Sequence, residues 1–402
     1  MCPVTPGITV YAKWTAVQYT VTYDANGGNG TAPNSQVVDS GASILVAEQG
    51  SLTYTERTFT GWNTMPNGAG DSYTAGYSLP VNENITLYAQ WEPDSIVEGA
   101  SLGAKFSWLQ TNAASNTRYI IEVNANESIS PQTLSWNGKN NIHITIRGVE
   151  DVKTISLNAN GSMFTISTGV TLVLENNITL QGVYGNNSSL IRVNIAGKFE
   201  MNGNTKITGN TNSSSSAAGG GVNVTGTFIM SDYSSVSGNN ATSSGSYPSG
   251  GGVYINSGGI FILQGNAAIS NNTTYSSSYA ASGGAGVYNA GTFTIRDNAV
   301  ISGNSSTAYN PAPPGHTGVW NPMTYCSGGG VYNDGAFRMA GGTIYGTNAV
   351  SEQKNSASSG ASLASSESGS AQYGFFNDDS FTSRGSLTTT NNTIAVVNGY
   401  LQ

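Results

Sequence analysis

Apolar and polar residues alternate over short stretches between residues 190 and 348, and the same arrangement occurs five times. Each copy contains a strand-like stretch in which a phenylalanine and the residue two positions later share one face, while the residue between them faces away. A valine-centred stretch precedes it, and an isoleucine- or valine-centred stretch follows it. The pattern therefore predicts three short strands per repeat. The five phenylalanines are Phe199, Phe228, Phe261, Phe293 and Phe337.

The repeats predict regular coils of a parallel β-helix over about residues 190–348. Gly, Asn, Ser and Thr dominate the segment and are poor in helix interiors, so we exclude a helical repeat. An asparagine recurs after the third strand of each copy except the last, which has Thr347. We expect these amides to hydrogen-bond along the stack at a corner where the backbone is left-handed. The asparagines are Asn210, Asn239, Asn272 and Asn304.

The flanking segments predict the ends of the same β-helix domain, residues 94–402. Leu102, Phe106 and Leu109 have roughly helical spacing, so we expect a short amphipathic helix at about 100–114 that caps the first coil. Strand-like stretches with less regular spacing follow from Tyr119. A Ser/Ala-rich stretch leads to closing strands at about 371–402.

Residues 18–93 form a separate unit with three motifs in order: Val21 to Gly28, Phe59 to Asn63, and Leu87 to Trp91. These motifs resemble the Listeria–Bacteroides repeat, which is related to the B repeat of internalin surface proteins. The resemblance implies a small β-grasp-like module, found in tandem on bacterial surface proteins as a spacer or interaction module. Residues 8–14 nearly repeat residues 85–91, so we interpret residues 1–17 as the tail of a truncated preceding repeat.

The second domain resembles the right-handed β-helix surface proteins of bacteria, of the pectin-lyase-like and polymorphic outer-membrane type. The Gly-Val-Tyr-Asn runs at 286–289 and 330–333 carry this resemblance. The predicted fold is thus all-β: a right-handed parallel β-helix with an N-terminal helical cap, preceded by the β-grasp-like module.

Composition and charge exclude several classes of partner and cofactor. Only 9% of the 402 residues are charged and the net charge is −8, with no basic stripe, so nucleic acid is not an expected partner. No apolar run is long enough to cross a membrane. The two histidines, His143 and His316, lie far apart in the sequence, so we expect no metal and no cofactor. We expect a monomer that is extracellular or on the bacterial cell surface.

The connection after each asparagine varies in length, which indicates that one edge of the β-helix carries the insertions. It grows from 12 positions between Asn210 and Val222 to 27 between Asn304 and Val331. Insertions on one edge of a solenoid commonly form a binding face, although neutral loops are an equal alternative. The longest insertion offers four candidate contact residues, which would otherwise pack back onto the helix: Tyr309, His316, Trp320 and Tyr325.

A second candidate is the row Tyr254, Tyr288 and Tyr332. Each follows an inward valine, so we expect the three rings to face outward at the same height of successive coils. Flat phenol rings can stack against sugars while their hydroxyls stay in water. The alternative is that the loops cover them.

The sequence favours a non-enzymatic adhesin that binds glycans or host and cell-surface proteins. Enzymes need general acids, bases or a metal, and the regular coils contain no pair of aspartates. One alternative is a polysaccharide lyase or hydrolase, which would need carboxylates of the early coils to converge. Another is a passive surface spacer. The early carboxylates are Glu122, Glu127, Glu150 and Asp151.

Overall fold

The computed structural model describes residues 16–54, 57–93, 95–244, 247–277, 282–308, 326–345, 355–359, 375–377, 394–397 and 400–401. Side chains are described up to residue 356, apart from 326 and 327. The chain divides into two compact units, Met1–Asp94 and Ser95–Gln402, which are considered separately. The predicted tail at residues 1–17 lies almost wholly outside the described residues.

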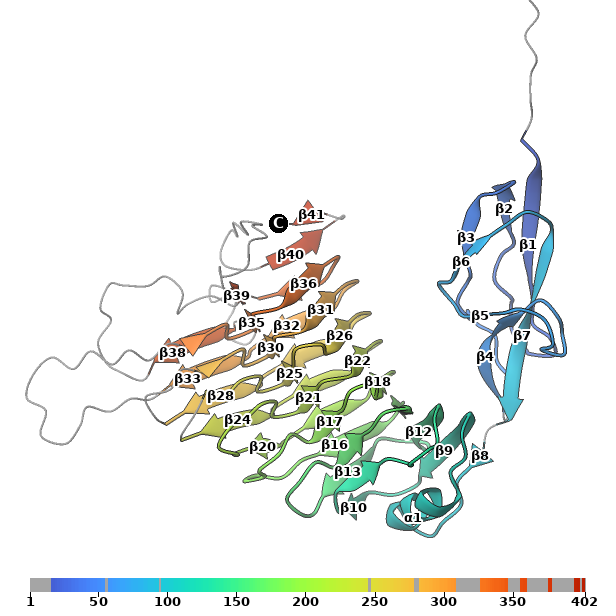
Figure 1. The fold of residues 1–402 in the computed structure, drawn as a ribbon. Helices are drawn as coiled ribbons and strands as arrows, with labels where there is room; N and C mark the ends of the chain where they lie inside the picture. Colours follow the sequence, from blue (N-terminus) through green and yellow to red (C-terminus); the bar gives the residue numbers. More distant parts are fainter. Residues whose placement is uncertain are drawn as a thin grey trace, which may run out of the picture. The chain divides into compact units, whose positions relative to one another are not determined.

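The N-terminal unit is built on a five-stranded sheet with the order β2-β1-β7-β4-β5 (Figure 1). Its first and last long strands, β1 and β7, are parallel neighbours, as expected for a β-grasp-like module, and the other pairings are antiparallel. A separate antiparallel pair, β3 and β6, completes the unit. The strands are β1 (Gln18–Asp24), β2 (Gln36–Asp39), β3 (Ser43–Leu45), β4 (Arg57–Asn63), β5 (Ser72–Tyr73), β6 (Ser78–Pro80) and β7 (Ile85–Pro93).

The motif residues of this unit pack around two tryptophans. Trp62 is fully buried, and its indole N–H donates to the carbonyl of Ala47 (2.9 Å). The indole N–H of Trp91 donates to the carbonyl of Ala25 (2.8 Å). A Cβ atom at Gly28 would lie 2.5 Å from the Trp91 ring, so glycine is required there. The first and third motifs thus hold each other in place.

The second unit begins with β8 (Ser95–Ile96) and one helix, α1 (Leu102–Asn112). Ser101 caps the helix by accepting a hydrogen bond from the Ala104 N–H (3.2 Å). Leu102, Phe106 and Leu109 are buried and belong to the same apolar cluster as the first coils. The Phe106 ring lies 5.3 Å from that of Phe164. The helix forms where the sequence predicted it, and its role as a cap stays a prediction.

Three long sheets form a β-solenoid (Figure 1). Sheet 1 contains β8, β9 (Thr117–Val123), β12 (Ile142–Gly148), β15 (Val170–Glu175), β18 (Lys198–Met201), β22 (Thr227–Met230), β26 (Ile260–Leu263), β31 (Thr292–Ile295) and β36 (Ala336–Met339). Sheet 2 contains β10 (Glu127–Ile129), β13 (Lys153–Leu157), β16 (Ile178–Gln181), β19 (Lys206–Thr208), β23 (Ser235–Ser237), β27 (Ala268–Ser270), β32 (Val300–Ser302), β37 (Thr343–Ile344), β40 (Ile394–Val397) and β41 (Tyr400–Leu401).

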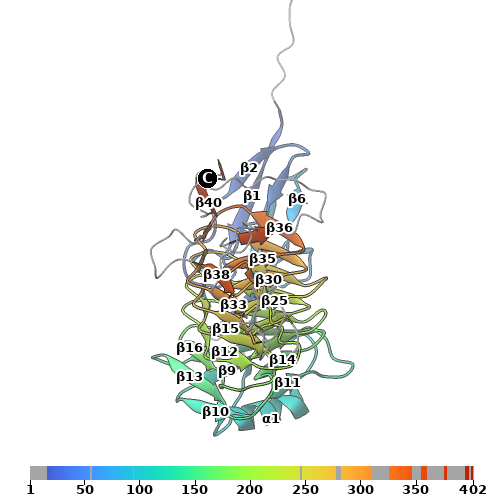
Figure 2. The ribbon, with the colours of Figure 1, turned by 90° about the vertical axis from the view of Figure 1, so that its left-hand side faces the viewer.

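Sheet 3 contains β11 (Gln132–Leu134), β14 (Phe164–Ile166), β17 (Ile191–Val193), β21 (Val222–Val224), β25 (Val253–Ile255), β30 (Val287–Asn289), β35 (Val331–Asn333) and β39 (Phe375–Asn377). The chain passes from sheet 3 to sheet 1 to sheet 2 and back in each coil, so that strands from successive coils lie side by side (Figure 2). In the regular coils every such pair is parallel and in register. The predicted parallel β-helix is confirmed.

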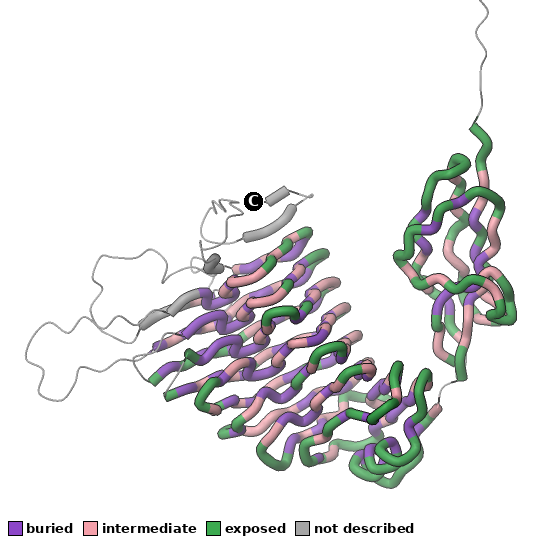
Figure 3. Tube along the Cα trace, in the orientation of Figure 1, coloured by how far each residue is buried: buried purple, intermediate pink, exposed green. Residues whose placement is uncertain are grey.

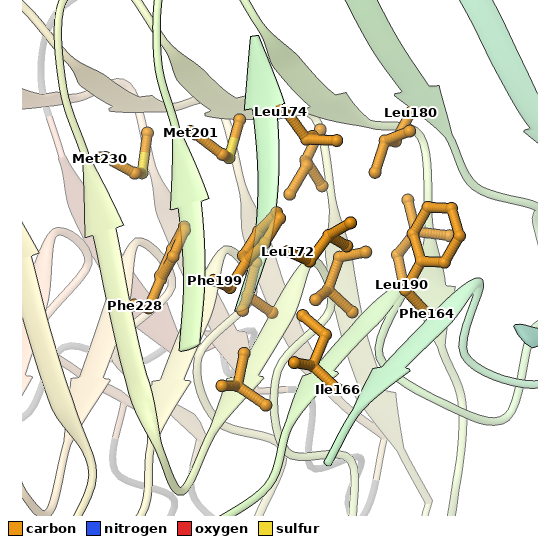
Figure 4. Close-up of a cluster of buried hydrophobic side chains, with 14 of the residues drawn as sticks. Phe164, Ile166, Leu172, Leu174, Leu180, Leu190, Phe199, Met201, Phe228 and Met230 are labelled. Carbon is orange, nitrogen blue, oxygen red and sulfur yellow. The ribbon is translucent and has the colours of Figure 1, made fainter. Parts of the chain in front are cut away.

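The core is made of columns of apolar residues stacked along the solenoid axis, and one column consists of phenylalanines. Phe199, Phe228, Phe261 and Phe293 are fully buried, with ring centroids 4.7–5.1 Å apart and planes within 13°. Figure 4 shows the first two of these rings beside Met201 and Met230, which stack in the same way. Phe337 ends the column with a tilted ring at 5.6 Å. Burial alternates along strands of the regular coils such as β18 and β22 (Figure 3), as the sequence pattern predicted.

A second column, of asparagines, lines the corner after sheet 2. Asn239 shows the repeated geometry: its backbone N–H (3.0 Å) and side-chain Nδ2 (3.1 Å) both donate to Oδ1 of Asn272 in the next coil. Its Nδ2 also donates to the carbonyl of Ile207 in the coil before (3.2 Å). Every member is at most 1% exposed, so these bonds satisfy amides that have no access to water. The column contains Asn210, Asn239, Asn272, Asn304 and Asn355.

Two details of this corner differ from the sequence expectation. The left-handed residue is the one before Asn210, Asn239, Asn272 and Asn304, as in Gly238 (φ 67°) and Asn271 (φ 55°). The last copy also has its asparagine. Asn355 accepts from both the backbone and the side-chain N–H groups of Asn304 (2.9 Å each), after a longer connection that hid it in the sequence.

Replacing Asn272 with alanine removes the acceptor of the buried backbone N–H of Asn239 and the amide that donates to the carbonyl of Val236. Each buried group that loses its partner costs about 1–3 kcal/mol, so we expect the free energy of unfolding to fall by roughly 2–4 kcal/mol. Chemical denaturation of the purified chain measures it. Asn266→Ala, at an exposed turn position of the same coil, is the matched control and should change stability by less than about 0.5 kcal/mol. Equal losses for both variants would contradict a structural role for the column.

Candidate binding surface

The predicted tyrosine row exists, on the outward face of sheet 3. Tyr254, Tyr288 and Tyr332 are direct register partners on β25, β30 and β35. Their ring centroids are 4.8 Å and 4.9 Å apart, and each pair of planes is within 5°. The inward neighbours Val253 and Val287 are fully buried, whereas the three tyrosines are half-buried. The regular strands thus hold three phenols in one stacked column.

Because the rings are stacked, the part of each ring that a ligand can reach is not the face that we expected from the sequence. Because neighbouring rings lie face to face, each ring covers the face of the next, and the central ring has both faces occupied. A sugar cannot stack on the row in the way predicted from the sequence, except at its ends. The row instead presents ring edges and hydroxyls, which donate and accept hydrogen bonds.

The surroundings of the row are polar. Burial raises the pKa of Tyr254 above its ordinary value, and the negative charge of Asp334 raises it further, so this phenol stays protonated at neutral pH. One coil earlier the same column has Asn223, which donates to the carbonyl of Ala218 (3.0 Å) and accepts from Nδ2 of Asn256 (2.9 Å). Two coils earlier it has the exposed Arg192.

The segments after the asparagine corner form a structured lateral extension, not the simple loops predicted from their composition. Its first layer is a parallel sheet along one edge of the solenoid (Figure 1). A second, shorter layer returns the chain toward sheet 3. The first layer contains β20 (Thr211–Asn212), β24 (Asn240–Ser243), β28 (Thr273–Ser276), β33 (Ser305–Ala308) and β38 (Ser356–Ser359), and the second contains β29 (Ser282–Gly283) and β34 (Cys326–Ser327).

The interior of the lateral extension is made of small hydroxyl and methyl side chains. The hydroxyl of Thr274 donates to that of Ser306 (2.9 Å), which also bonds the hydroxyl of Ser282 in the second layer (2.8 Å). Ala241 and Ala308 are fully buried in the same layer. Small residues let the two layers approach closely. Along each strand of the first layer, these inward residues alternate with residues that face outward. One outward row of this sheet is Thr242, Tyr275 and Thr307, with Tyr275 39% exposed.

The four candidate residues of the longest insertion are Tyr309, His316, Trp320 and Tyr325. They lie outside the described residues, between β33 of the first layer and β34 of the second. Their role in contact stays a prediction from the sequence.

The early carboxylates of the enzymatic alternative each have a separate partner or position. Glu122 forms an ion pair with Arg147 (2.8 Å), and Glu127 accepts a hydrogen bond from the Leu102 N–H at the start of α1 (2.7 Å). Asp151 pairs with Lys153, and Glu150 occupies a left-handed turn position (φ 68°). Glu122 is thus engaged on sheet 1, Glu127 at the start of the helix, and Glu150 and Asp151 at a turn.

A group of charged side chains on the outward face of sheet 1 was not predicted from the sequence. Arg118, His143 and Lys198 follow one another in one column of β9, β12 and β18, with Thr171 between the last two. A second column, two outward positions along the strands, has Glu122, Arg147 and Glu175, and the column between them contains Thr145 and Glu200. The residues come from four coils, so only the strand register reveals the group. Among the described residues, no three His, Cys, Asp or Glu side chains gather into a possible metal site.

His143 faces outward, as predicted, but its ring is largely covered. Burial lowers its pKa to about 4, and the neighbouring cation of Arg118 contributes to the decrease. Its Nδ1 atom is buried with no hydrogen-bond partner among the described residues. The imidazole is therefore neutral at physiological pH.

Comparison with known proteins identifies the N-terminal unit. It is a Listeria–Bacteroides repeat. The family model of the Listeria–Bacteroides repeat domain matches residues 19–90, which include β1 to most of β7. The motifs around Trp62 and Trp91 that hold the unit together lie largely within this match, so the predicted resemblance is confirmed for that part of the chain.

Two relatives come from Evansella cellulosilytica. One, named "Putative Gly-rich membrane protein", is 40% identical over 86 residues, which are 21% of this chain and 10% of the relative. The other, named "Putative membrane protein", is 37% identical over 90 residues, which are 22% of this chain and 14% of the relative. The chain thus spans a small part of the length of either. No solved structure matches it.

These findings are consistent with a surface protein, because the repeat is a surface module and both relatives have membrane protein names. Within the part of the chain that the structure describes, no helix is long and apolar enough to cross a membrane.

The low pKa of His143 predicts a pH dependence of stability. In the unfolded chain the imidazole has an ordinary pKa of 6.5, so between pH 6.5 and about 4 the unfolded state binds more protons than the folded state. Stability should therefore fall as pH decreases through this window. NMR titration should show one histidine neutral down to about pH 4, and that signal should be absent from His143→Gln. A His143 pKa near 6.5 would contradict the burial described here.

Proposed function

We propose that this chain is a non-enzymatic adhesin of the bacterial cell surface, which binds glycans or cell-surface proteins through the looped edge of the β-helix. The observation that carries the proposal is the lateral extension. The chain devotes several successive coils to a two-layer structure on one edge, where a plain solenoid would need only a short corner. Its outward face displays hydroxyls and the ring of Tyr275, groups suited to contact with polar surfaces.

Two further observations support the proposal. The N-terminal unit matches the Listeria–Bacteroides repeat, which is a surface module. The described strands of the extension contain no charged residue, so binding there would depend on hydrogen bonds and aromatic contact. A passive spacer would need neither the ordered extension nor its outward aromatic residue.

The extension is tested by binding of the purified chain to glycan arrays and to immobilised cell-surface proteins. Tyr275→Ala combined with Thr307→Ala should weaken binding at least roughly fivefold, since each removes one side chain of the outward row. Ser237→Ala with Ser270→Ala, on the neighbouring outward face of sheet 2, is the matched control and should bind like the wild type.

A third variant addresses the predicted contact loop. Replacing residues 309–325 with a short Gly/Ser linker should reduce binding if Tyr309, His316, Trp320 and Tyr325 contribute. Unchanged binding would limit the site to the structured extension and sheet 3. A wild-type chain that binds none of the glycans or proteins would contradict the adhesin and favour the spacer.

A further inference from the structure

One outward column of sheet 3 presents a long polar side chain in each of five successive coils, and the shorter Thr133 and Thr165 precede them in the first coils. The five are direct register partners on neighbouring strands, so they form a straight line parallel to the solenoid axis. They lie beside the glycine turns through which the lateral extension rejoins the solenoid, such as Gly250 and Gly284 (φ 65° and 57°). The five long side chains are those of Arg192, Asn223, Tyr254, Tyr288 and Tyr332.

The spacing of the column restricts the ligand that fits it. The tyrosine rings repeat every 4.8–4.9 Å, as successive coils do. An extended peptide advances about 3.3 Å per residue, so its side chains on one face recur at about twice that and fall out of step with the coils. An extended 1,4-linked glycan advances one sugar over nearly the height of one coil. Such a chain presents a hydroxyl to each side chain of the column.

We propose that this column binds an extended 1,4-linked glycan that runs along the solenoid axis with about one sugar per coil. The proposal rests on the adhesin function and specifies its ligand class, its site and its direction. The contacts are hydrogen bonds from phenol edges, since the stacked rings have no free faces between them. A phenol hydroxyl both donates and accepts, so it can bond a sugar while keeping a bond within the protein.

The other two members of the column suit the same ligand. The side-chain amide of Asn223 is fixed by its bonds to Ala218 and Asn256, so it is preorganised at its place in the line. Arg192 is exposed and has no ion-pair partner among the described residues, which leaves its guanidinium available to sugar hydroxyls. The stacked tyrosines lose little conformational freedom on binding, because their neighbours already hold them.

Calorimetric titration with length-defined neutral oligosaccharides tests the proposal. The probes are 1,4-linked series of two to six sugars, such as cello-, chito- and manno-oligosaccharides. Affinity should rise with each added sugar and level off near five, when the five long side chains are all in contact. An affinity that is the same for disaccharide and pentasaccharide in every series that binds would overturn the axial arrangement.

Tyr288→Phe separates hydroxyl contact from ring contact. The phenylalanine keeps the stacked ring and loses only the hydroxyl, so the fold should be unchanged, and pentasaccharide binding should weaken roughly three- to tenfold. Tyr275→Phe, on the lateral extension, is the matched control and should leave that affinity unchanged. Full binding by Tyr288→Phe would overturn the proposed contacts. Thermal denaturation of both variants checks that neither has lost structure.

The outcomes also separate this inference from the adhesin function. A wild-type chain that binds immobilised cell-surface proteins but none of the oligosaccharides would overturn the glycan column and leave the adhesin standing. A chain that binds neither would overturn both. Oligosaccharide binding that is weakened in Arg192→Ala and Tyr288→Phe, and unchanged in Tyr275→Phe, is the result that the proposal predicts.

Discussion

The parallel register between successive coils is the constraint on which the rest of the structure depends. A single coil cannot satisfy its own backbone N–H and C=O groups or bury its own apolar side chains, so each coil depends on the next. Register then places identical residues at identical heights. The phenylalanine column, the asparagine column and the tyrosine row are three results of the same repetition, in the core, at a corner and on the outer surface.

The asparagine column explains how a surface extension is compatible with this register. In each coil the chain departs from the solenoid at the same corner. Without the asparagines, buried N–H groups at this corner would have no acceptors. The amide of Asn272, for example, accepts from the preceding coil and donates to the carbonyl of Val236. The hydrogen bonds of the corner are therefore satisfied whatever the length of the connection after it. That connection can lengthen from one coil to the next, as it does before Val331, while the coils themselves stay aligned.

The repetition also determines how much could be predicted from the sequence. The inward positions of Phe228 and Met230, the outward tyrosines and the asparagine column follow from spacing alone. The lateral extension does not, because its alternating positions hold small residues such as Ala241 and Ser243, which do not contrast enough with Ser and Thr to mark a strand. That weak alternation after each asparagine was the available signal. The stacking of the tyrosine faces and the charged group around His143 needed the register between coils, which one sequence does not supply.

The proposed lack of enzymatic activity is the central claim, since it separates a binding solenoid from a β-helix enzyme. The most direct measurement is product release from a panel of neutral and acidic polysaccharides incubated with the purified chain, with and without calcium. Reducing ends and the absorbance of unsaturated sugars would be followed against a boiled control. The account predicts no release above the control on any substrate. Turnover would contradict it and direct attention to the charged residues on the outward face of sheet 1, above all His143, Arg147 and Glu175.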